Sequence, residues 1–442
     1  MTDDIDFAVD ETAVADVSHI LDGLNEAQRE AVTAPPGHML VLAGAGSGKT
    51  RVLVHRIAWL CQVEGASPFN IFAVTFTNKA AAEMRSRVEK LQGMPSAGMW
   101  VGTFHGLSHR LLRSHWKEAG LPQTFQILDS DDQYRLIRRV LKALELDESH
   151  WPPRQAQAFI NARKDEGQRP PHIDTSHNPV YTQLVRIYTA YEAACQRAGV
   201  IDFAELLLRT LELLRDNDSL LEHYQHRFKH VLVDEFQDTN TIQYALIRLL
   251  AGSNNKVFIV GDDDQAIYAW RGARVENLHK FQKDFKSAQI VRLEQNYRST
   301  TTILSAANAL IDNNSDRLGK KLWTSGEDGE QILFYNAFNE QDEARFVIER
   351  ARQWAEQGHA RADIAILYRS NAQSRVFEER LVSEGIPYRV YGGLRFFERA
   401  EIKDALAYLR LIDNRNDDAS FERVVNTPTR GIGDRSVEKI RE

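Results

Sequence analysis

Residues 38–50 read HMLVLAGAGSGKT, an apolar run followed by a glycine-rich loop that ends in lysine and threonine. The run 38–44 predicts a buried strand, and the helical periodicity from residue 51 predicts a helix directly after the loop. Glycines let backbone N–H groups surround a phosphate, and the start of the following helix favours negative charge. We therefore predict a phosphate-binding loop in which Lys49 reaches the β- and γ-phosphates of a nucleotide and Thr50 binds Mg²⁺.

The loop departs from the strict pattern at its first position, where Ala43 replaces the usual glycine. We expect Gly44 to provide the tight turn instead. The residues predicted to surround the phosphates are Ala43, Gly44, Ala45, Gly46, Ser47, Gly48, Lys49 and Thr50.

Short apolar runs alternate with helical stretches on either side of a long helical segment. Runs at 71–77 and 99–104 follow the loop, and the strand pattern returns at 230–235, 256–262 and 289–296. This order predicts an α/β fold, a parallel sheet covered by helices, with a helical insertion at 105–228. A second α/β region is predicted from strands near 332–338, 363–370 and 386–393, and helices are expected again at 393–442.

The composition is typical of a globular protein, with 442 residues, 43% hydrophobic and 26% charged. The sequence has no apolar run long enough for a transmembrane helix and no basic, apolar signal segment at its start. Cys61 and Cys195 fit neither a metal-binding spacing nor a disulfide framework. We expect a cytoplasmic protein with no membrane partner.

The formal net charge is −7, but residues 1–22 contain acidic residues and no lysine or arginine. We predict that this segment is an acidic, flexible tail. The rest of the chain is close to neutral, so the net charge neither supports nor excludes a nucleic-acid partner.

Adjacent carboxylates follow the apolar run VLV, at Asp234 and Glu235. Ligands of open α/β sheets bind beyond the carboxyl ends of the strands, where this pair is expected to lie. Asp234 suits binding of Mg²⁺, and Glu235 suits activation of an attacking water molecule.

The stretch 260–272, VGDDDQAIYAWRG, places acidic residues, an amide, two aromatic rings and an arginine after another strand. Gln265 suits sensing of a γ-phosphate or orientation of its water. Tyr268, Trp270 and Arg271 are types that stack on or contact single-stranded bases. A core position for Trp270 is the alternative.

Three further strand ends carry polar or aromatic side chains. Arg298, after the strand at 289–296, could stabilise charge on a transferred phosphoryl group. The stretches 75–79 and 102–106 offer hydroxyls, amides and an aromatic ring suited to a nucleic-acid backbone and a stacked base. The candidates for DNA contact there are Phe76, Asn78, Thr103 and His105.

Six ordered motifs carry a resemblance. The chain resembles the UvrD/Rep/PcrA family of superfamily 1 DNA helicases in six stretches, which occur in this order: GAGSGKT, VTFTNKAAAEM, GTFHGL, LVDEFQDTN, VGDDDQAIYAWRGA and LEQNYRST. The resemblance implies an enzyme that couples ATP hydrolysis to 3′→5′ movement on single-stranded DNA and unwinds duplexes at junctions, in DNA repair or replication. It implies ATP and Mg²⁺ as cofactors and DNA-repair proteins as partners.

The resemblance also implies roles that the spacing alone does not. Gln28 would read the adenine edge, and Arg51 and Tyr297 would lie on either side of the adenine ring. Lys49, Thr50, Asp234, Glu235, Gln265 and Arg298 would serve ATP binding and hydrolysis. Phe76, Tyr268 and Trp270 would stack on bases, beside Asn78, Thr103, His105 and Arg271.

The family has two RecA-like motor domains, each with a helical insertion. We assign the first to 23–104 and 229–294, its insertion to 105–228, an incomplete second motor domain to 295–392 and the start of its insertion to 393–442. Further family motifs, including a second arginine that contacts the γ-phosphate, are absent from this sequence, which we interpret as the N-terminal part of a longer chain. The alternative function is a nucleotide-gated single-stranded DNA-binding fragment without turnover, since a lost charge donor commonly slows such chemistry about a hundredfold or more.

Overall fold

The computed structural model describes residues 17–93, 98–176, 178–314, 317–391, 400–415 and 417–441. The side chains of Arg271, Asp434, Arg435, Glu438 and Arg441 are outside this description. The chain divides into two compact units, Met1–Glu330 and Gln331–Glu442.

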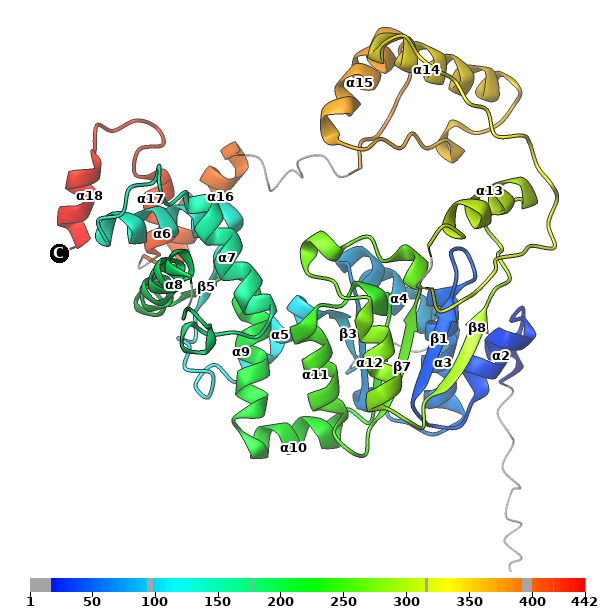
Figure 1. The fold of residues 1–442 in the computed structure, drawn as a ribbon, viewed down its shortest axis with the longest axis horizontal. Coiled ribbons are helices and arrows are strands. Elements are labelled where there is room, and N and C mark those ends of the chain that lie inside the picture. The colour runs from blue at the N-terminus through cyan, green and yellow to red at the C-terminus, as the bar shows by residue number, and fades with distance from the viewer. Residues whose placement is uncertain are drawn as a thin grey trace, which may run out of the picture. The chain divides into compact units, whose positions relative to one another are not determined.

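A six-stranded parallel sheet forms the centre of the first unit (Figure 1). Its strand order is β3-β2-β6-β7-β1-β8, and every pair is parallel. The strands are β1 Met39–Ala43, β2 Ile71–Thr75, β3 Trp100–Thr103, β6 His230–Val233, β7 Lys256–Gly261 and β8 Gln289–Leu293. All six were predicted from apolar runs, and the predicted fold class is confirmed.

Alternate residues of β1 face two separate hydrophobic cores. Leu40 and Leu42 belong to one core, whereas Met39, Val41 and Ala43 belong to the other. This alternation follows from the two-residue period of a strand, and it shows that the sheet is buried on both faces. The helices that flank the sheet are α2 Glu26–Thr33, α3 Lys49–Gln62, α4 Asn78–Gln92, α5 Phe104–Ser114, α11 Thr241–Ala251 and α12 Glu276–Asp284.

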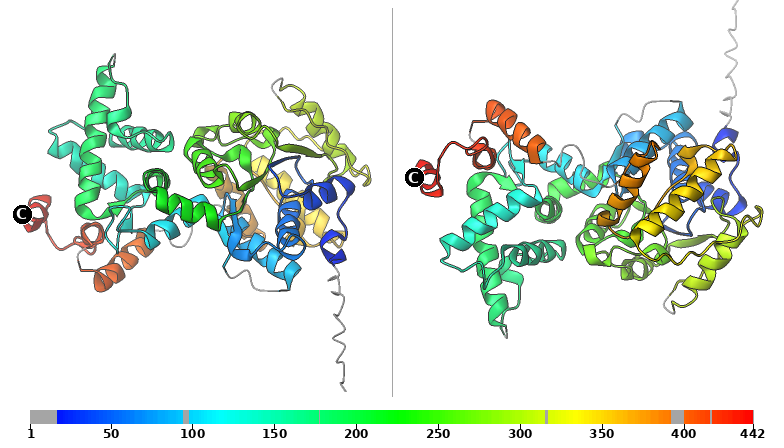
Figure 2. Two further views of the ribbon diagram at one scale, coloured as in Figure 1. Left: turned by 90° about the horizontal axis from the view of Figure 1, so that it is seen from below. Right: turned by 90° about the horizontal axis from the view of Figure 1, so that it is seen from above.

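The helical insertion forms a bundle beside the sheet, as both views of Figure 2 show in teal and green. Its helices are α6 Ser130–Ala143, α7 Pro153–Asp165, α8 Pro179–Ala198, α9 Phe203–Arg215 and α10 Asp218–Arg227. It also contains a short parallel sheet of β4 Gln126–Ile127 and β5 Val200–Ile201, which was not predicted because two residues carry no periodicity. The short 3₁₀ turns of the first unit are η1 Pro68–Asn70, η2 Pro170–His172, η3 Phe236–Asp238, η4 Asp263–Gln265 and η5 Ala269–Arg271.

The end of the predicted acidic tail is folded. Residues Ser18–Leu21 form helix α1, in which Ile20 is fully buried in the core that also contains Met39, Val41 and Ala43. The Nδ1 atom of His55 lies 2.5 Å from the Ile20 carbonyl oxygen, and Arg51 donates to the carbonyl of Asp22 at 3.4 Å. Burial of an apolar side chain lowers the free energy of the folded state, so this segment is part of the fold. The predicted end of the tail at residue 22 is therefore too late. Residues 1–16 of the predicted tail lie outside the described residues.

The second unit is helical where it is regular. Its elements are α14 Glu340–Glu356, η6 Arg361–Asp363, η7 Asn371–Gln373, α15 Ser374–Ser383, α16 Ala400–Asp413, α17 Asp418–Val424 and α18 Asp434–Arg441. Helix α13 Thr301–Ile311 belongs to the first unit. A small apolar cluster joins α14 to α15 through Ala344, Ile348, Phe377 and Leu381.

The three strands predicted at 332–338, 363–370 and 386–393 do not form. Within the described residues of the second unit no strand ladder occurs, and 392–393 lie outside them. Several apolar side chains of these segments are exposed, with Phe334 at 89%, Phe338 at 98% and Leu367 at 90%, whereas Ile366 and Ile386 pack partly buried against the cluster of α14 and α15. A strand needs a hydrogen-bonded neighbour, and an apolar run predicts the strand without supplying that neighbour.

Within the described part of the chain, no helix has both the length and the apolar character needed to cross a membrane.

Candidate nucleotide and nucleic-acid sites

The glycine-rich loop lies between β1 and α3, at the carboxyl edge of the sheet. Gly46 and Gly48 adopt left-handed backbone angles, with φ of +67° and +88°. A Cβ atom on Gly46 would lie 2.6 Å from Nδ2 of Asn296 and 2.7 Å from Cβ of Arg298. Gly46 is therefore required both by the backbone conformation and by the close approach of the chain after β8.

Gly44 does not have the role that the sequence suggested. Its φ lies outside the left-handed region, so the turn is made by Gly46 and Gly48. A Cβ atom on Gly44 would lie 2.1 Å from Cδ2 of Leu322, so the absence of a side chain makes room for Leu322 instead.

Protein donors orient the loop so that it fits an anion. The carbonyl of Gly44 accepts from Ser47 Oγ at 2.7 Å, and that of Ala45 accepts from Asn296 Nδ2 at 2.6 Å. The carbonyls of Gly46 and Ser47 accept from the Tyr297 N–H at 3.0 Å and from Gln28 Nε2 at 2.8 Å. Because a trans peptide points its C=O and N–H in opposite directions, the N–H groups that follow Ala45 and Ser47 face away from these donors. The loop and the start of α3 thus fit a phosphate group.

Lys49, the first residue of α3, contacts residues that follow two other strands of the sheet. Its Nζ atom lies 2.8 Å from Oε1 of Gln265, 3.1 Å from Oε2 of Glu235 and 3.9 Å from Oδ2 of Asp262. These partners follow β6 and β7; in the sheet β7 lies beside β1, and β6 lies on the other side of β7. Three residues predicted from separate motifs are therefore brought into one cluster.

Asp234 is buried, and the structure gives its carboxylate few donors. Thr75 Oγ1 donates to Oδ2 at 3.4 Å, and the Glu235 N–H donates to Oδ1 at 3.1 Å. Burial, with a contribution from the charge of Glu235, raises the pKa of Asp234 to about 7. A buried carboxylate with so few donors, together with the hydroxyl of Thr50 in the first turn of α3, is a suitable set of oxygen ligands for Mg²⁺.

Glu235 has a backbone conformation that is rare for a residue with a side chain, with φ +49° and ψ +47°. Its Oε2 atom accepts from Nε2 of Gln237 at 2.8 Å. Gln237 also accepts the N–H of Asp262 at 2.9 Å, so it connects the ends of β6 and β7. Sequence reasoning did not single out Gln237, although it lies in the quoted stretch LVDEFQDTN.

The residues expected around adenine flank the loop. Gln28 is buried and closes a capping box with Asn25 at the start of α2, and its Nε2 atom holds the loop through Ser47. The hydroxyl of Tyr297 accepts from Nδ2 of Asn25 at 2.8 Å, and Tyr297 is 55% exposed. Arg51 lies in the first turns of α3 with its Cβ 3.7 Å from the position of a Cβ on Gly48. Their roles toward a nucleotide base stay predictions.

Arg298 follows the loop's partner Asn296, whose Oδ1 atom accepts the Arg298 N–H at 2.8 Å. Its side chain is exposed next to Gly46. Arg298 is therefore placed beside the phosphate-binding loop by the same residue that holds Ala45.

A cavity of about 810 Å³ lies between the strand ends and the helical insertion. Four residues predicted to contact DNA line it, namely Phe76, Thr103, His105 and Trp270. The volume is in the range of ordinary ligand pockets, roughly 300–1,000 Å³. The aromatic rings and polar groups of this cavity suit stacking and hydrogen bonding of a nucleobase.

The aromatic residues after β7 lie close to one another and to Phe76. Trp270 is 74% exposed, so the alternative core position is excluded. Tyr268 stacks on Phe76 with ring centroids 5.3 Å apart, and it lies 6.2 Å from the ring of Trp270. The side chain of Arg271 lies outside the described residues.

The polar residues after β2 and β3 contact each other. Thr103 Oγ1 donates to Oδ1 of Asn78 at 3.4 Å and accepts the N–H of Gly106 at 3.1 Å, which caps α5. Burial lowers the pKa of His105 to about 4, so its imidazole is neutral near pH 7. His105 can therefore offer a ring and a hydrogen bond, but no positive charge.

Sequence reasoning missed the opposite wall of the cavity, which the insertion supplies. Gln133, Asn161, Asp165 and Phe203 line it from α6, α7 and α9. No local motif marks these residues, because they meet the strand ends only in the folded chain. Phe203 lies 5.9 Å from His105 between ring centroids and is 56% exposed.

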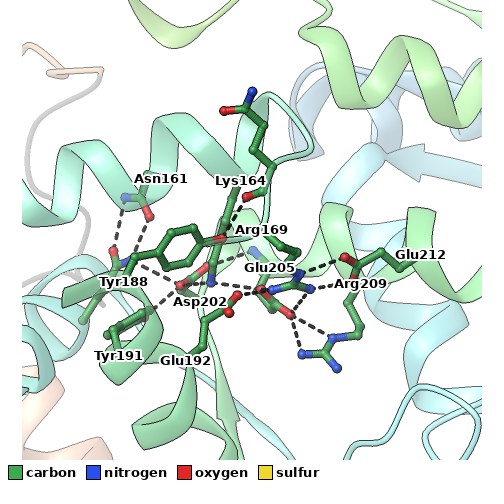
Figure 3. Close-up of polar contacts among 12 residues, drawn as sticks. Asn161, Lys164, Arg169, Tyr188, Tyr191, Glu192, Asp202, Glu205, Arg209 and Glu212 are labelled. Atoms are coloured by element: carbon green, nitrogen blue, oxygen red, sulfur yellow. Dashed lines mark hydrogen bonds and ion pairs between the residues drawn. The ribbon is translucent and has the colours of Figure 1, made fainter. Parts of the chain in front are cut away.

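A buried polar network holds this wall in place (Figure 3). Asn161 Oδ1 accepts from Gln133 Nε2 at 2.7 Å, and Gln133 also donates to Asp202 at 3.3 Å. Asp202 accepts from Lys164 Nζ at 2.7 Å and from the hydroxyl of Tyr191 at 2.8 Å. A fully satisfied network of this kind rigidifies the side chains that it connects.

Comparisons with known proteins cover both units. A model of the family described as UvrD/REP helicase N-terminal domain matches residues 24–286. A model of the family described as UvrD-like helicase C-terminal domain matches residues 291–442.

Three relatives are similar over almost all of this chain. DNA helicase II of Escherichia coli (strain K12) is 66% identical over 427 residues, which are 97% of this chain and 59% of the relative. DNA helicase II of Haemophilus influenzae is 60% identical over 96% of this chain and 59% of its own length. ATP-dependent DNA helicase PcrA of Staphylococcus aureus is 45% identical over 95% of this chain and 58% of its own length. The chain therefore spans about three fifths of the length of these relatives.

Proposed function

Because the chain belongs to the UvrD/REP helicase family, we propose that it binds and hydrolyses ATP as part of a 3′→5′ DNA helicase that moves on single-stranded DNA. The observation that carries the proposal is the position of Lys49. Its ammonium contacts both Glu235 and Gln265 at the point where three neighbouring strands end beside the phosphate-binding loop. A lysine that contacts phosphates and a side chain that orients the attacking water are among the groups that recur in enzymes of phosphoryl transfer.

The proposed ATP site uses the residues of that edge. The loop 43–50 binds the phosphates, and Thr50 and Asp234 hold Mg²⁺, which neutralises phosphate charge when bound. Glu235 orients the attacking water, and Gln265 senses the γ-phosphate by contact with it. Arg298 stabilises charge on the γ-phosphate. Gln28, Arg51 and Tyr297 take the adenine base.

The proposed DNA site is the cavity between strand ends and insertion. Phe76, Tyr268 and Trp270 stack on bases, and Asn78, Thr103, His105 and Arg271 contact the strand beside them. The relatives' names, DNA helicase II and ATP-dependent DNA helicase, support DNA and ATP as substrates. We further propose that duplex junctions are unwound, that DNA-repair proteins are partners, and that the protein acts in the cytoplasm without a membrane.

Steady-state ATP hydrolysis tests the proposal. We expect turnover by the 442-residue chain that increases with single-stranded DNA and falls by at least about a hundredfold in Lys49→Ala, since a lost charge donor costs that much. Lys90→Ala, which changes an exposed lysine of α4, is the control and retains turnover.

Two other results would contradict the proposed hydrolysis of ATP at this site. Equal turnover in the parent and in Lys49→Ala contradicts the proposed site. Retained binding of ATP and single-stranded DNA without turnover favours the alternative, a nucleotide-gated DNA-binding fragment.

A further inference from the structure

Three consecutive carboxylates follow β7, and one buried lysine lies among them. Lys320 Nζ is 2.7 Å from Oδ1 of Asp262, 2.5 Å from Oδ1 of Asp263 and 2.9 Å from Oδ2 of Asp264. The side chain of Lys320 is only 3% exposed. The attraction of the three carboxylates outweighs the effect of burial and raises the pKa of Lys320, so the ammonium is charged.

A second cation and the backbone secure the same contact. Arg317 makes a two-pronged contact with Asp264, at 2.8 Å and 2.9 Å, and also donates to the Lys320 carbonyl at 2.9 Å. The N–H of Leu318 donates to Oδ2 of Asp263 at 2.7 Å. The segment 317–320 is therefore fixed to the acidic turn by several hydrogen bonds in addition to those of the Lys320 ammonium.

The acidic turn carries Gln265, which contacts the proposed catalytic lysine. Residues Asp263–Gln265 form one 3₁₀ turn, and the Gln265 N–H donates to the Asp262 carbonyl at 3.0 Å. The Gln265 amide oxygen accepts from Lys49 Nζ at 2.8 Å, and Asp262 Oδ2 lies 3.9 Å from the same atom. The position of the turn thus decides where the Gln265 amide lies relative to Lys49.

Without a cation the three carboxylates could not remain together. Their oxygen atoms lie within 4.8 Å of one another, close enough to hold a metal ion. Like charges at such distances repel strongly in a partly buried site, and a hard divalent cation is the usual way to neutralise them. In this chain an ammonium occupies that position instead.

We propose that Lys320 is a positioning residue for ATP hydrolysis: its ammonium is a built-in cation that holds Asp262–Asp264 together, keeps Gln265 against Lys49 and excludes a divalent ion from the acidic turn. The proposal rests on the proposed function for its effect on turnover, but not for its effect on cation binding. No motif marks Lys320 in the sequence RLGKKLW.

The test compares the parent with Lys320→Met and with Lys321→Met, which changes the neighbouring exposed lysine. Mn²⁺ binding without nucleotide is measured by electron paramagnetic resonance. We expect Lys320→Met to bind one more Mn²⁺ than the parent, because oxygen-rich carboxylate sites suit this ion. We expect its kcat for ATP to fall about ten- to hundredfold with KM changed less than about threefold, as for a group that acts in the transition state. Lys321→Met matches the parent in both measurements.

The proposal is overturned if folded Lys320→Met binds no additional Mn²⁺ and keeps the parent kcat. Should Lys320→Met fail to fold, Lys320→Gln carries the same two measurements, since its amide still donates hydrogen bonds to the carboxylates. If the parent itself hydrolyses no ATP, the proposed function fails and the Mn²⁺ count alone decides the role of Lys320.

Discussion

Glu235 is held in a conformation that costs free energy. Of the described residues other than glycine, Glu235 and Glu145 have left-handed φ angles, +49° and +56°. Such a conformation costs a residue with a Cβ atom roughly 1–2 kcal/mol. Strain of this kind is often found where a side chain must be aimed at a ligand, and here it turns the carboxylate of Glu235 toward Lys49.

A pair of substitutions separates the strain from the chemistry. Glu235→Gly and Glu235→Ala both remove the carboxylate, and both are expected to abolish ATP hydrolysis. The glycine variant is expected to be more stable than the alanine variant by about 1 kcal/mol, because only glycine adopts this backbone freely. Chemical denaturation measures the difference, and the same pair at Glu145 is the control that leaves hydrolysis intact. Equal stability of the two Glu235 variants contradicts the strain.

Local motifs predicted the side chains that converge on Lys49, but not those that support them. Glu235 and Gln265 were identified because each follows an apolar strand, and parallel strands bring their ends to one edge. Lys320 was missed because its partners Asp262–Asp264 are more than fifty residues away in sequence. The distance between such groups is a property of the folded chain, and no spacing in the sequence encodes it.

At the scale of the elements, α7 connects the insertion to the strand ends. Asp165, its last residue, accepts from Nδ2 of Asn240 at 3.1 Å and lines the cavity. Burial, with repulsion from Asp202, raises the pKa of Asp165 to about 6. Oε1 of the neighbouring Glu166 lies 3.5 Å from Nη2 of Arg274. The contacts of Asp165 and Glu166 at this end of α7 are therefore both polar.

The raised pKa predicts a pH-dependent stability. The neutral carboxyl of Asp165 contributes stability that is fully present below the unfolded pKa of about 4 and is lost as pH rises through 6. We expect the free energy of unfolding to fall by roughly 1 kcal/mol between pH 5 and pH 7.5 from this group. Asp165→Asn removes that part of the pH dependence, whereas Asp218→Asn, at an exposed position of α10, does not. An unchanged pH profile in Asp165→Asn contradicts the prediction.

The strand predictions were right for the sheet of the first unit and wrong for the second unit, for a common reason. Runs such as MLVLA and IFAVT are buried on both faces, so their composition alone indicates a central parallel strand. The run ILFYNAF is equally apolar, yet Phe334 and Phe338 are exposed and unpaired with any strand of the described chain. Composition predicts which segments can be strands, and pairing depends on what lies beside them.

At the scale of the whole molecule, the two units differ in the size of their cores. The first unit contains two large hydrophobic cores that cover both faces of the sheet. The cluster between α14 and α15 has only four buried residues. The second unit also exposes large apolar side chains such as Phe338 and Leu367, and apolar surface promotes association where it is contiguous.

Removal of the second unit is therefore expected to improve behaviour in solution. A chain ending at Glu330 retains the complete sheet and the residues proposed to bind ATP. We expect it to melt in one cooperative transition and to bind less of a dye that reports exposed apolar surface than the 442-residue chain does. Light scattering and calorimetry measure both properties. A shortened chain that aggregates more than the parent contradicts this prediction.

The strand order also has a consequence for synthesis on the ribosome. Strand β1 lies between β7 and β8, so both of its neighbours are made long after it. At about 5–20 residues per second, the roughly 250 residues from β1 to the end of β8 take between about ten and fifty seconds to translate. Until β7 has been made the apolar strand MLVLA has no neighbouring strand, while the local helices of the insertion can already form. A chaperone that shields nascent apolar segments would therefore be needed most before residue 256 emerges, and the insertion would be the first part of the protein to acquire its native shape.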